Sequence, residues 1–424
     1  MNFRLAPTVP WLLLYVVINL MATVIMLNSG ELIGDVAGSN LYSVSALVWA
    51  AVLVIGFYVV FLWPVFNFVS KIKITSLNFG IPDDVIGKRI GIILVFIQLG
   101  FMFFNLSEGV NVAGSNNTRT SSLVSIIWVL VPADALFIIY YGMYRDNKLF
   151  KYNLVIWLVS NLMRGWAGVI MFVVFFEWCR LVYNKRSGVI KGLYIVVLLL
   201  LSYPILLNLK WLFRASVGSG LGLESIADAL FDNLDSQDYL VMIGSGVDHI
   251  IGRIQVISLV VEVMRLRDLL QSEFLNGGFT PFWMEGLHGV IYERLFIGER
   301  SMPIGVAFTQ YAEFNWEFEV GNWNTNIGYV GWFFIAPYLV PVYIAYTLFL
   351  CFVSFYVLKK IGATQLSKDM LWFVWLVYLM APWLAVFVNF IYALCVFFVI
   401  KYIFSRKALS YPCDRKGVSK FVVD

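Results

Sequence analysis

Charged residues are scarce in this chain. Asp, Glu, Lys and Arg together make up 13% of its 424 residues, about half the usual share in soluble proteins. Hydrophobic residues make up 61%, and the mean hydropathy is +0.82. So little charge excludes a soluble globular protein of this length. The composition predicts an integral membrane protein whose solvent is largely lipid.

Cysteine and histidine are rarer still, with four and two copies. The cysteines fall in predicted membrane spans or in the C-terminal tail, so we expect neither a disulfide framework nor a zinc cluster. The sequence also lacks a Walker loop, a dinucleotide fingerprint and a G-x-S-x-G elbow. Nucleotide-driven transport and serine-hydrolase chemistry therefore have no support. We expect no cofactor, no metal and no nucleic-acid partner.

Long apolar runs are abundant, and such runs predict transmembrane helices because lipid forces the backbone hydrogen bonds to close within the segment. The first run has no small-residue cleavage site after it, so we expect it to be retained and not removed as a signal peptide. The last two predicted spans are joined by a turn at 381–383, with one long tilted helix over 370–403 as the alternative. The ten predicted spans are 9–27, 43–69, 90–106, 122–144, 152–163, 166–183, 190–209, 327–357, 370–386 and 388–403.

The distribution of basic residues predicts the orientation, because cytoplasmic loops collect Lys and Arg. Segments that alternate along the chain hold 21 of its 30 basic residues, as ten spans with both ends inside require. The segment 210–326 instead has 7 Lys and Arg against 15 Asp and Glu. We therefore predict that it is a large loop outside the cytoplasm. The basic segments are the N-terminus, 70–89, 145–151, 180–191, 358–369 and the tail from Lys401.

The large loop divides the chain into three parts. These are the first seven spans (1–209), the loop with amphipathic helices (210–326), and the last spans with a cytoplasmic tail (327–424). The apolar spacing from Tyr239 to Leu270 predicts a helix that could lie along the membrane interface. A turn at 276–281 and a second helical stretch from about Pro281 to Ile297 follow.

All basic residues of the loop after Lys210 are arginines. A guanidinium group binds phosphate oxygens through paired N–H donors, so an all-arginine set beside a membrane suits a diphosphate ligand. The alternative is that most of these arginines pair with the acids of the loop. The candidates for diphosphate binding in the loop are Arg253, Arg267, Arg294 and Arg300.

Both histidines also lie in the loop, and His288 has the more suggestive neighbours. On a single helix, Glu285, His288 and Tyr292 would share a face that could hold a general base oriented by a carboxylate. We therefore expect His288, Glu285 or Glu293 to be catalytic, against the alternative that His288 is a surface or capping residue. A Glu-x-x-His pair is also half of a metal site, but no second copy accompanies it.

Two ionisable residues fall within the apolar segments. Arg164 lies between two short predicted spans, where a positive charge is costly unless it reaches water or a ligand. It is a candidate for binding a diphosphate, and the alternative is that it reaches the outer headgroups. Asp134 is also intramembrane and has no obvious partner nearby in the sequence.

Three stretches carry a likeness to a known family. They are 160–168 (SNLMRGWAG), 302–314 (MPIGVAFTQYAEF) and 322–331 (NWNTNIGYVG). Together with ten spans, cytoplasmic ends and one long late loop, they resemble the Wzy-type O-antigen polymerases, bacterial inner-membrane enzymes that join lipid-linked oligosaccharide repeat units. Tyr311 in the second stretch joins Asp134 as a further candidate site residue.

The resemblance implies an all-α polytopic membrane protein with a GT-C-like glycosyltransferase architecture. It implies a multi-pass protein of the bacterial inner membrane with its large loop in the periplasm. The implied reaction moves a growing glycan from undecaprenyl diphosphate onto the non-reducing end of another undecaprenyl-diphosphate-linked oligosaccharide. Membrane lipid and a chain-length regulator protein are further implied partners, and no cofactor is implied.

Three alternatives stay open. A receptor or scaffold would have the loop but no need for the intramembrane Arg164 and Asp134. O-antigen ligases resemble this chain too, but they usually show a histidine just before the final large-loop helix, where residues 321–326 contain none. A lipid-linked oligosaccharide flippase would also be polytopic, but we would expect its charges around a central cavity and no loop of this length. For a polymerase, we assign the leaving diphosphate to Arg164 and the loop arginines. Deprotonation of the acceptor hydroxyl falls to His288, Glu285 or Glu293.

Overall fold

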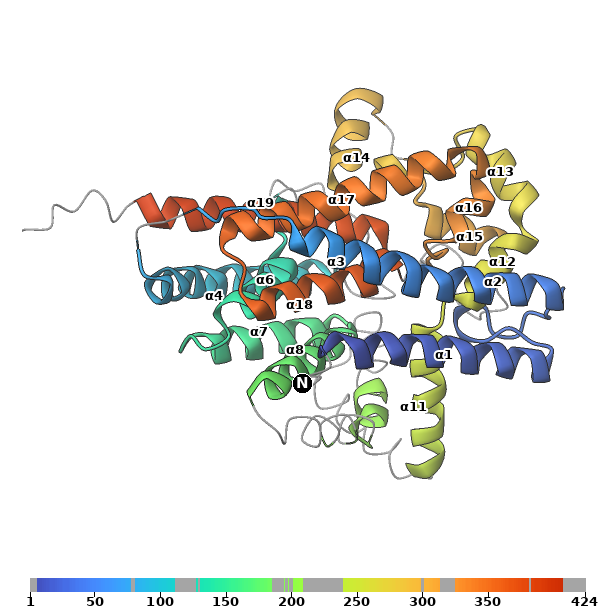
Figure 1. Ribbon diagram of the computed structural model, residues 1–424, viewed down its shortest axis with the longest axis horizontal. Coiled ribbons are helices and arrows are strands. Elements are labelled where there is room, and N and C mark those ends of the chain that lie inside the picture. Colours follow the sequence, from blue (N-terminus) through green and yellow to red (C-terminus); the bar gives the residue numbers. More distant parts are fainter. Residues whose placement is uncertain are drawn as a thin grey trace, which may run out of the picture.

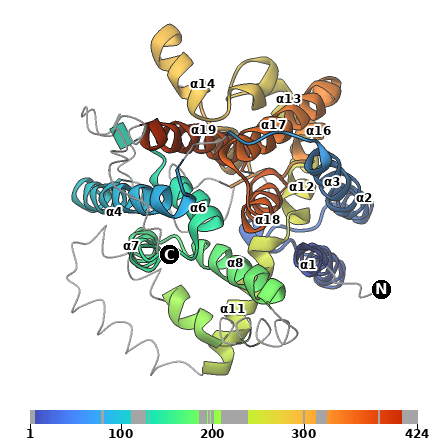
Figure 2. The ribbon, with the colours of Figure 1, turned by 60° about the vertical axis from the view of Figure 1, so that its left-hand side comes forward.

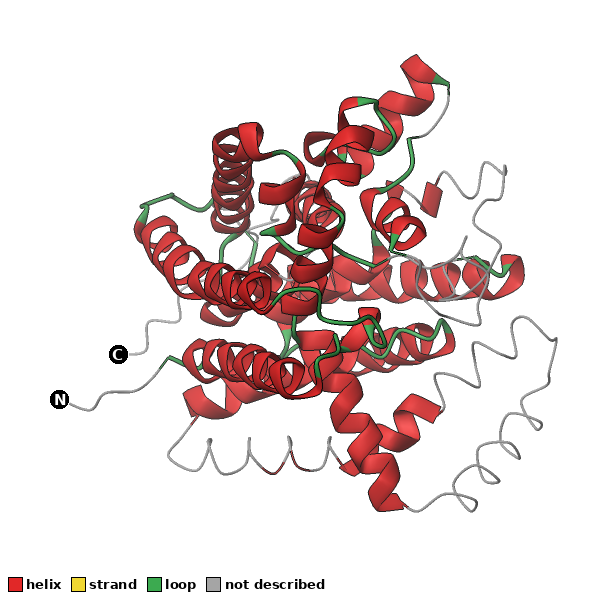
Figure 3. Ribbon diagram, turned by 90° about the vertical axis from the view of Figure 1, so that its right-hand side faces the viewer, coloured by secondary structure: helices red, strands yellow, loops and turns green. Residues whose placement is uncertain are grey.

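The computed structural model (Figure 1) describes residues 6–77, 81–110, 127–128, 130–184, 194, 197, 201–208, 239–298, 301–312, 325–380 and 383–406. Within these residues the secondary structure is helical (Figure 3), apart from one isolated antiparallel bridge between Glu31 and Asn40. The predicted all-α class is therefore confirmed.

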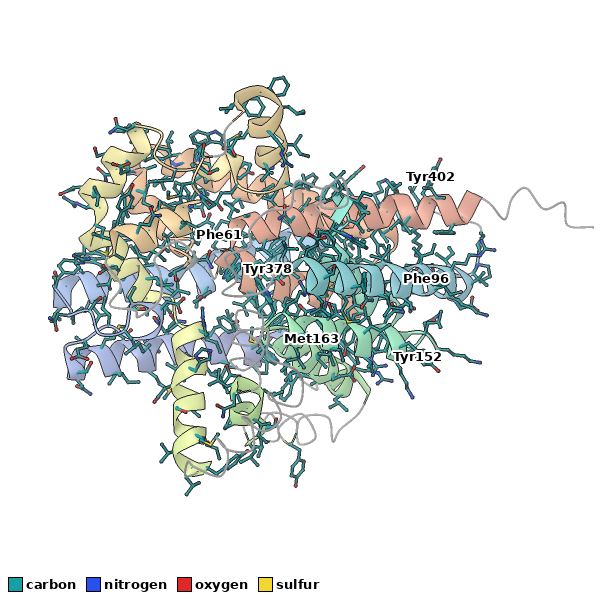
Figure 4. The ribbon with its side chains drawn as sticks, turned by 180° about the vertical axis from the view of Figure 1, so that it is seen from behind. Phe61, Phe96, Tyr152, Met163, Tyr378 and Tyr402 are labelled. Carbon is teal, nitrogen blue, oxygen red and sulfur yellow. The ribbon has the colours of Figure 1, made fainter. Side chains whose placement is uncertain are left out.

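Five helices in the described part of the chain are long and apolar enough to cross a membrane. Their 22 to 28 residues extend roughly 33 to 42 Å at about 1.5 Å per residue, more than the ~30 Å of a hydrocarbon layer. Large apolar side chains such as Phe96 lie on the outside of the bundle, as expected for contact with lipid (Figure 4). The five are α1 (Thr8–Ser29); α2 (Val44–Gly56) continued by η2 (Phe57–Leu62) and α3 (Trp63–Lys71); α4 (Asp83–Glu108); η6 (Pro337–Leu339) continued by α17 (Val340–Ile361); and α19 (Leu384–Arg406).

Other segments that the sequence predicts as full spans are shorter helices. α6, α7 and α8 contain 12, 14 and 16 residues, or roughly 18 to 24 Å, which is too short to cross alone. The predicted spans 122–144 and 190–209 fall partly outside the described residues. The shorter helices are α6 (Ala133–Tyr144), α7 (Phe150–Met163), α8 (Val169–Asn184), and α18 (Gln365–Val374) continued by η7 (Trp375–Met380).

Helix α18 lies in the middle of the bundle (Figure 2). The seven consecutive residues Met370 to Leu376, at the end of α18 and the start of η7, are all buried. The ring of Phe373 stacks on Phe175 of α8 with centroids 4.1 Å apart. A helix that is apolar on every side is stable when protein surrounds it. The apolar run at 370–376 therefore marks burial inside the bundle and not a surface in contact with lipid.

The connection between α18 and α19 settles one alternative. η7 runs to Met380 and α19 runs from Leu384, and Lys401 Nζ on α19 donates to the carbonyl oxygen of Ile361, which precedes α18 (3.0 Å). One helix over 370–403 would carry Lys401 roughly 46 Å from residue 370, so the single long helix is wrong. The predicted turn at 381–383 includes residues 381–382, which lie outside the described part.

One end of the bundle gathers the predicted basic segments, and we call it the basic end. Lys401 near the end of α19 donates hydrogen bonds to Asp83 Oδ1 (2.9 Å) and to the carbonyl oxygen of Ile361 (3.0 Å). These bonds place the end of α19, the start of α4 and the end of α17 together. Other hydrogen bonds at this end join Asn147 to Asp84, Thr364 to Gly142, Leu77 to Lys360, and Trp178 to Pro7.

The described part of the loop consists of short helices that pack against the other end of the bundle. The predicted helix from Tyr239 breaks at 255–256, where the backbone N–H of Val256 donates to Asn19 Oδ1 of α1 (3.1 Å). After the break, α12 is buried against α1 and α2. The expected interfacial position is therefore wrong for α12, because all of its residues from Ile257 to Val263 are buried in the protein, the polar Ser258 and Glu262 included. The pieces are α11 (Tyr239–Ile254), α12 (Ile257–Arg265) and α13 (Arg267–Leu275).

The rest of the loop is also divided more finely than the sequence predicts. Gly277 has φ +74°, which confirms the predicted turn. The expected helix from Pro281 to Ile297 is instead three pieces, because Gly286 has φ +107° and ends helical geometry there. The pieces are η3 (Phe282–Met284), α14 (Leu287–Tyr292) and η4 (Glu293–Ile297), followed by α15 (Ile304–Tyr311) and α16 (Gly331–Ile335).

Candidate functional site

A cavity of about 160 Å³ lies between the loop and the start of α19. A cavity of about 150 Å³ in a protein core accommodates a benzene ring, so this space suits one six-membered ring. Glu285, Glu293, Trp332 and Trp383 are among the residues that line it. Since α19 has 23 residues, the cavity lies roughly 34 Å along that helix from the basic end.

Glu285 is positioned by contacts with the first turns of α19. The backbone N–H of Ala385 donates to its carboxyl group, and the first N–H groups of a helix have no partner within the helix. The N–H of Leu287 donates in return to Asn389 Oδ1 (2.9 Å). These two bonds fix the segment around Glu285 over the end of α19.

Gly286 and Gly289 allow the segment around Glu285 to pack closely against α19. A Cβ on Gly286 would lie 2.8 Å from Val388 Cγ1 of α19, and its φ of +107° is unfavourable for other residues. A Cβ on Gly289 would lie 1.7 Å from the carbonyl oxygen of Met284. Glycine at both positions allows the backbone to turn back on itself and approach α19 closely.

The opposite wall of the cavity comes from the chain after η4. Thr280 donates its backbone N–H to the carbonyl oxygen of Met302 (2.8 Å). Gly305, three residues on, accepts from the backbone N–H of Thr325 (3.3 Å). These bonds hold three separated stretches of the loop beside one another, so the cavity is built from residues more than 100 positions apart in sequence.

The carboxyl group of Glu285 has an unusual environment. Its Oε1 atom is buried and has no hydrogen-bond partner among the described residues. Burial raises the pKa of Glu285 to about 8, and the hydrogen bond from the Ala385 N–H offsets only part of that rise. At neutral pH this group therefore holds a proton in most molecules and can release it readily.

Glu293 is the second carboxylate of the cavity. It is the first residue of η4 and is 4% exposed. None of the described residues that line the cavity is a lysine, arginine or histidine. Two carboxyl groups beside two tryptophan rings suit a ligand with hydroxyl groups and an apolar face, such as a sugar ring. They do not suit a diphosphate.

His288 does not share a face with Glu285. The predicted face required one helix through 285, 288 and 292, but α14 begins only at Leu287. His288 is exposed, and its Nε2 lies 2.7 Å from the carbonyl oxygen of Trp283. The structure therefore brings together Glu285 and Glu293 and places His288 outside the cavity.

Arg164 and Asp134 form an ion pair between α7 and α6. Arg164 Nη2 donates to both carboxylate oxygens of Asp134 (2.9 and 2.8 Å), and its Nε donates to the carbonyl oxygen of Ser160 (3.1 Å). Asn161 Nδ2 also donates to Asp134 (2.9 Å). Arg164 is 4% exposed. The partner that the sequence did not reveal for Asp134 is thus an arginine 30 residues away.

The ion pair lies beside the turn at Gly165, and the next residue, Trp166, contacts a residue that lines the cavity. Arg164 follows the last residue of α7, and Gly165 has φ +75°, which confirms the predicted turn. The rings of Trp166 and Trp383 then meet edge to face with centroids 6.1 Å apart. Because Trp383 also lines the cavity, the buried arginine and the acidic cavity are connected through these two tryptophans.

The loop arginines are spread out and do not line the cavity. Arg253 pairs with Asp35 (3.1 Å) and Arg267 with Asp268 (3.0 Å), so each has an acidic neighbour. Arg294 is exposed and directly follows Glu293. Arg300 lies outside the described residues. The described arginines thus do not form the single cluster that a shared diphosphate site would need, and Arg294 is the one beside the cavity.

Tyr311 is the last residue of α15 and is also absent from the cavity lining. Burial and the neighbouring carboxylate of Glu273, which accepts a hydrogen bond from the phenol, raise its pKa. This contact supports a role in holding α15 against α13.

Several residues that line or support the cavity were not predicted from the sequence. Trp332 and Trp383 belong to the chain after the loop, and Ala385 and Asn389 belong to α19. The one available signal was the Pro-Trp pair just before an apolar run, which marks a helix start. Comparisons with protein-family models, with curated proteins and with solved structures found no match to this chain.

Proposed function

We propose that the chain is a glycosyltransferase of the Wzy type, an O-antigen polymerase of the bacterial inner membrane. It transfers a growing glycan from undecaprenyl diphosphate onto the non-reducing sugar of another undecaprenyl-diphosphate-linked repeat unit. The observation that carries this proposal is the cavity that Glu285 and Glu293 line at the end of the bundle opposite the basic end. That end faces the periplasm, where lipid-linked repeat units are joined.

The cavity supports transfer to a sugar hydroxyl. In the reaction, the acceptor oxygen forms a bond to the anomeric carbon of the donor sugar, and the bond from that carbon to the diphosphate oxygen breaks. The proton of the acceptor hydroxyl passes to Glu285 in those molecules in which its carboxyl group is ionised. Its pKa of about 8 is close to the value that serves a general base near neutral pH. Glu293 holds a neighbouring hydroxyl in the same space.

The leaving diphosphate needs positive charge. Arg164 lies at the end of α7, whose 14 residues put it roughly 21 Å along that helix from the basic end, deeper than the cavity. This order matches a lipid-linked sugar, with its diphosphate nearer the membrane interior than its sugars. A diphosphate that reaches Arg164 takes the place of Asp134 as its anion.

The residues that line the cavity also help to distinguish a polymerase from a flippase. A flippase would require charged groups along a path through the bundle, whereas the two carboxylates lie between the loop and α19. The ligase shares the glycosyl-transfer chemistry, and the preference for a polymerase rests on the sequence resemblance and on the missing histidine at 321–326.

The test is a gel of surface lipopolysaccharide from a deletion strain of the parent bacterium. A polymerase predicts lipid A core capped by a single repeat unit, and full-length ladders after complementation with the wild-type gene. Bare core would instead indicate a ligase or a flippase, and an unchanged ladder would reject all three. Complementation with Glu285→Gln at normal expression should give the single-unit pattern, because the general base is absent.

A further inference from the structure

The segment 287–297 stands out from the bundle, and we call it the α14–η4 arm. Figures 1 and 2 show α14 projecting away from α17 and α19, crosswise to the long helices. Its base is held by the bond from Leu287 to Asn389. Gly286 (φ +107°) precedes it and Gly298 (φ +84°) follows it, so each end turns sharply.

The outer face of the arm is strongly apolar. Leu295 and Phe296 are 72% and 74% exposed, as much as Phe96 (71%) on the outside of α4. Ile291, Tyr292 and Ile297 are exposed beside them. Exposed clusters of this kind are unfavourable in water and mark a surface that something apolar covers.

The inner face of the arm differs. Leu287, Gly289 and Glu293 are buried, and Glu293 lines the cavity. The arm is therefore amphipathic, with one face fixed on the bundle and the other free among the described residues. Arg294 on the arm and the ring of Trp283 on η3 are also exposed, and arginine and tryptophan are residues that settle at a membrane surface.

The level of the arm along the bundle identifies what covers it. The arm packs on the first turns of α19, and the last turns of α19 lie at the basic end. The 23 residues of α19 extend about 34 Å, close to the thickness of a hydrocarbon layer. The arm therefore lies at the membrane surface opposite the basic end. α17 likewise exposes Val342 and Phe349.

We propose that the α14–η4 arm is an interfacial anchor whose face at Leu295, Phe296 and Ile297 is embedded in the lipid of the leaflet opposite the basic end. The anchor holds the cavity lined by Glu293 at the surface of the bilayer. A ligand with a lipid tail thus reaches the cavity without leaving the membrane. The anchoring does not depend on the proposed function and is measured without substrate.

Spin labels at single cysteines in lipid nanodiscs test the anchor. In a background without native cysteines, Leu295→Cys and Phe296→Cys are labelled separately in the full chain. Phe96→Cys on α4 serves as the control in lipid, and Asp268→Cys, on the exposed surface of α13, as the control in water. Collision rates with oxygen and with a water-soluble nickel complex are compared, because oxygen concentrates in lipid and the nickel complex is excluded from it.

The proposal predicts that both arm labels resemble Phe96→Cys, with high oxygen and low nickel accessibility. Nickel accessibility equal to that of Asp268→Cys at both positions would overturn it, because the arm would then lie in water. Dipolar broadening between labels at Phe296→Cys would also overturn it, since a second copy of the chain would then cover the arm. A failure of glycosyl transfer in the gel test would leave the oxygen accessibility, the nickel accessibility and the dipolar broadening unchanged, so the two proposals are tested separately.

Discussion

Two opposing effects at the start of α19 act on the pKa of Glu285. Burial disfavours the charged form, whereas the N–H of Ala385 and the positive end of the helix favour it. Burial is the larger effect, and the pKa rises to about 8. One oxygen of the group is left without a partner among the described residues, which is costly unless a ligand uses it.

Replacing Glu285 by Gln removes the proton acceptor and keeps the shape. We expect polymerisation in membranes to fall by about 10²- to 10⁴-fold, the usual contribution of a general base, with unchanged expression and thermal stability close to wild type. Asp268→Asn is the control, because Asp268 is an exposed loop carboxylate that does not line the cavity. Full activity in Glu285→Gln would show that another group accepts the proton.

The same pKa predicts how stability depends on pH. In the unfolded chain the carboxyl group loses its proton near pH 4.5, whereas in the folded protein it keeps the proton to about pH 8. Between these values the folded state binds more protons, so stability falls as pH rises. We expect the Tm of the wild type to decrease more from pH 5 to pH 8 than the Tm of Glu285→Gln. Equal decreases would contradict the raised pKa.

The pair of Arg164 and Asp134 predicts a strong coupling in stability. Either single change to Ala leaves a charge without its partner, and we expect a loss of about 3 kcal/mol for Asp134→Ala, because Arg164 is buried. The double variant should lose less than the sum of the single losses, since no unpaired charge remains. Denaturant unfolding of the four proteins measures the coupling. Additive losses would mean that the ion pair contributes little.

Single residues show how far the sequence could predict the site. Glu285, Glu293 and Arg164 stand out because charge is scarce in the chain. The structure places Glu285 and Glu293 in one cavity, and Arg164 is linked to it through Trp166 and Trp383. The partners Asp134 and Ala385 could not be predicted, because each contact depends on how distant helices pack. Sequence spacing describes neighbours along one helix only.

At the scale of the elements, the break before α14 decides which side chains meet. A continuous helix from Pro281 would have grouped Glu285 with His288. Gly286 interrupts it, and Glu285 turns toward α19 instead. A glycine in a helical pattern costs only about 1 kcal/mol, so the sequence alone could not distinguish a tolerated glycine from a break.

Gly289 supplies a direct test of this arrangement. A Cβ there would overlap the carbonyl oxygen of Met284, so Gly289→Ala should displace the turn that carries Glu285. We expect a Tm several degrees lower and a loss of activity. Gly244→Ala on α11 is the control, because a Cβ there meets nothing within 4 Å and alanine favours a helix. Wild-type behaviour of Gly289→Ala would mean that the turn is not needed.

At the scale of the whole molecule, the sequence predicted the class of fold, and five of the predicted spans correspond to helices in the described part that are long enough to cross a membrane. Apolar runs of similar length became long outer helices such as α4 or a buried inner helix such as α18. Hydropathy does not separate these two cases, because a protein interior and a lipid interior are both apolar. The grouping of the basic segments was predictable, since it follows from charge alone.

Orientation in the membrane is the remaining prediction at this scale. Lys148 lies in the connection between α6 and α7 at the basic end, and Asp268 lies on α13 at the other end. In spheroplasts, a membrane-impermeant maleimide should label Asp268→Cys and not Lys148→Cys, because basic segments stay in the cytoplasm. Both should react after the membrane is permeabilised, which controls for access to each thiol.

The reverse pattern would place the cavity on the cytoplasmic side and remove the basis for polymerisation in the periplasm. Labelling of both cysteines before permeabilisation would mean that the two ends do not lie on opposite sides of the membrane. We expect neither the reverse pattern nor the labelling of both cysteines, because the bonds of Lys401 to Asp83 and Ile361 gather the basic segments at one end. The cavity lies at the far end of the same helix, so the sidedness of the basic end fixes the side on which the chemistry occurs.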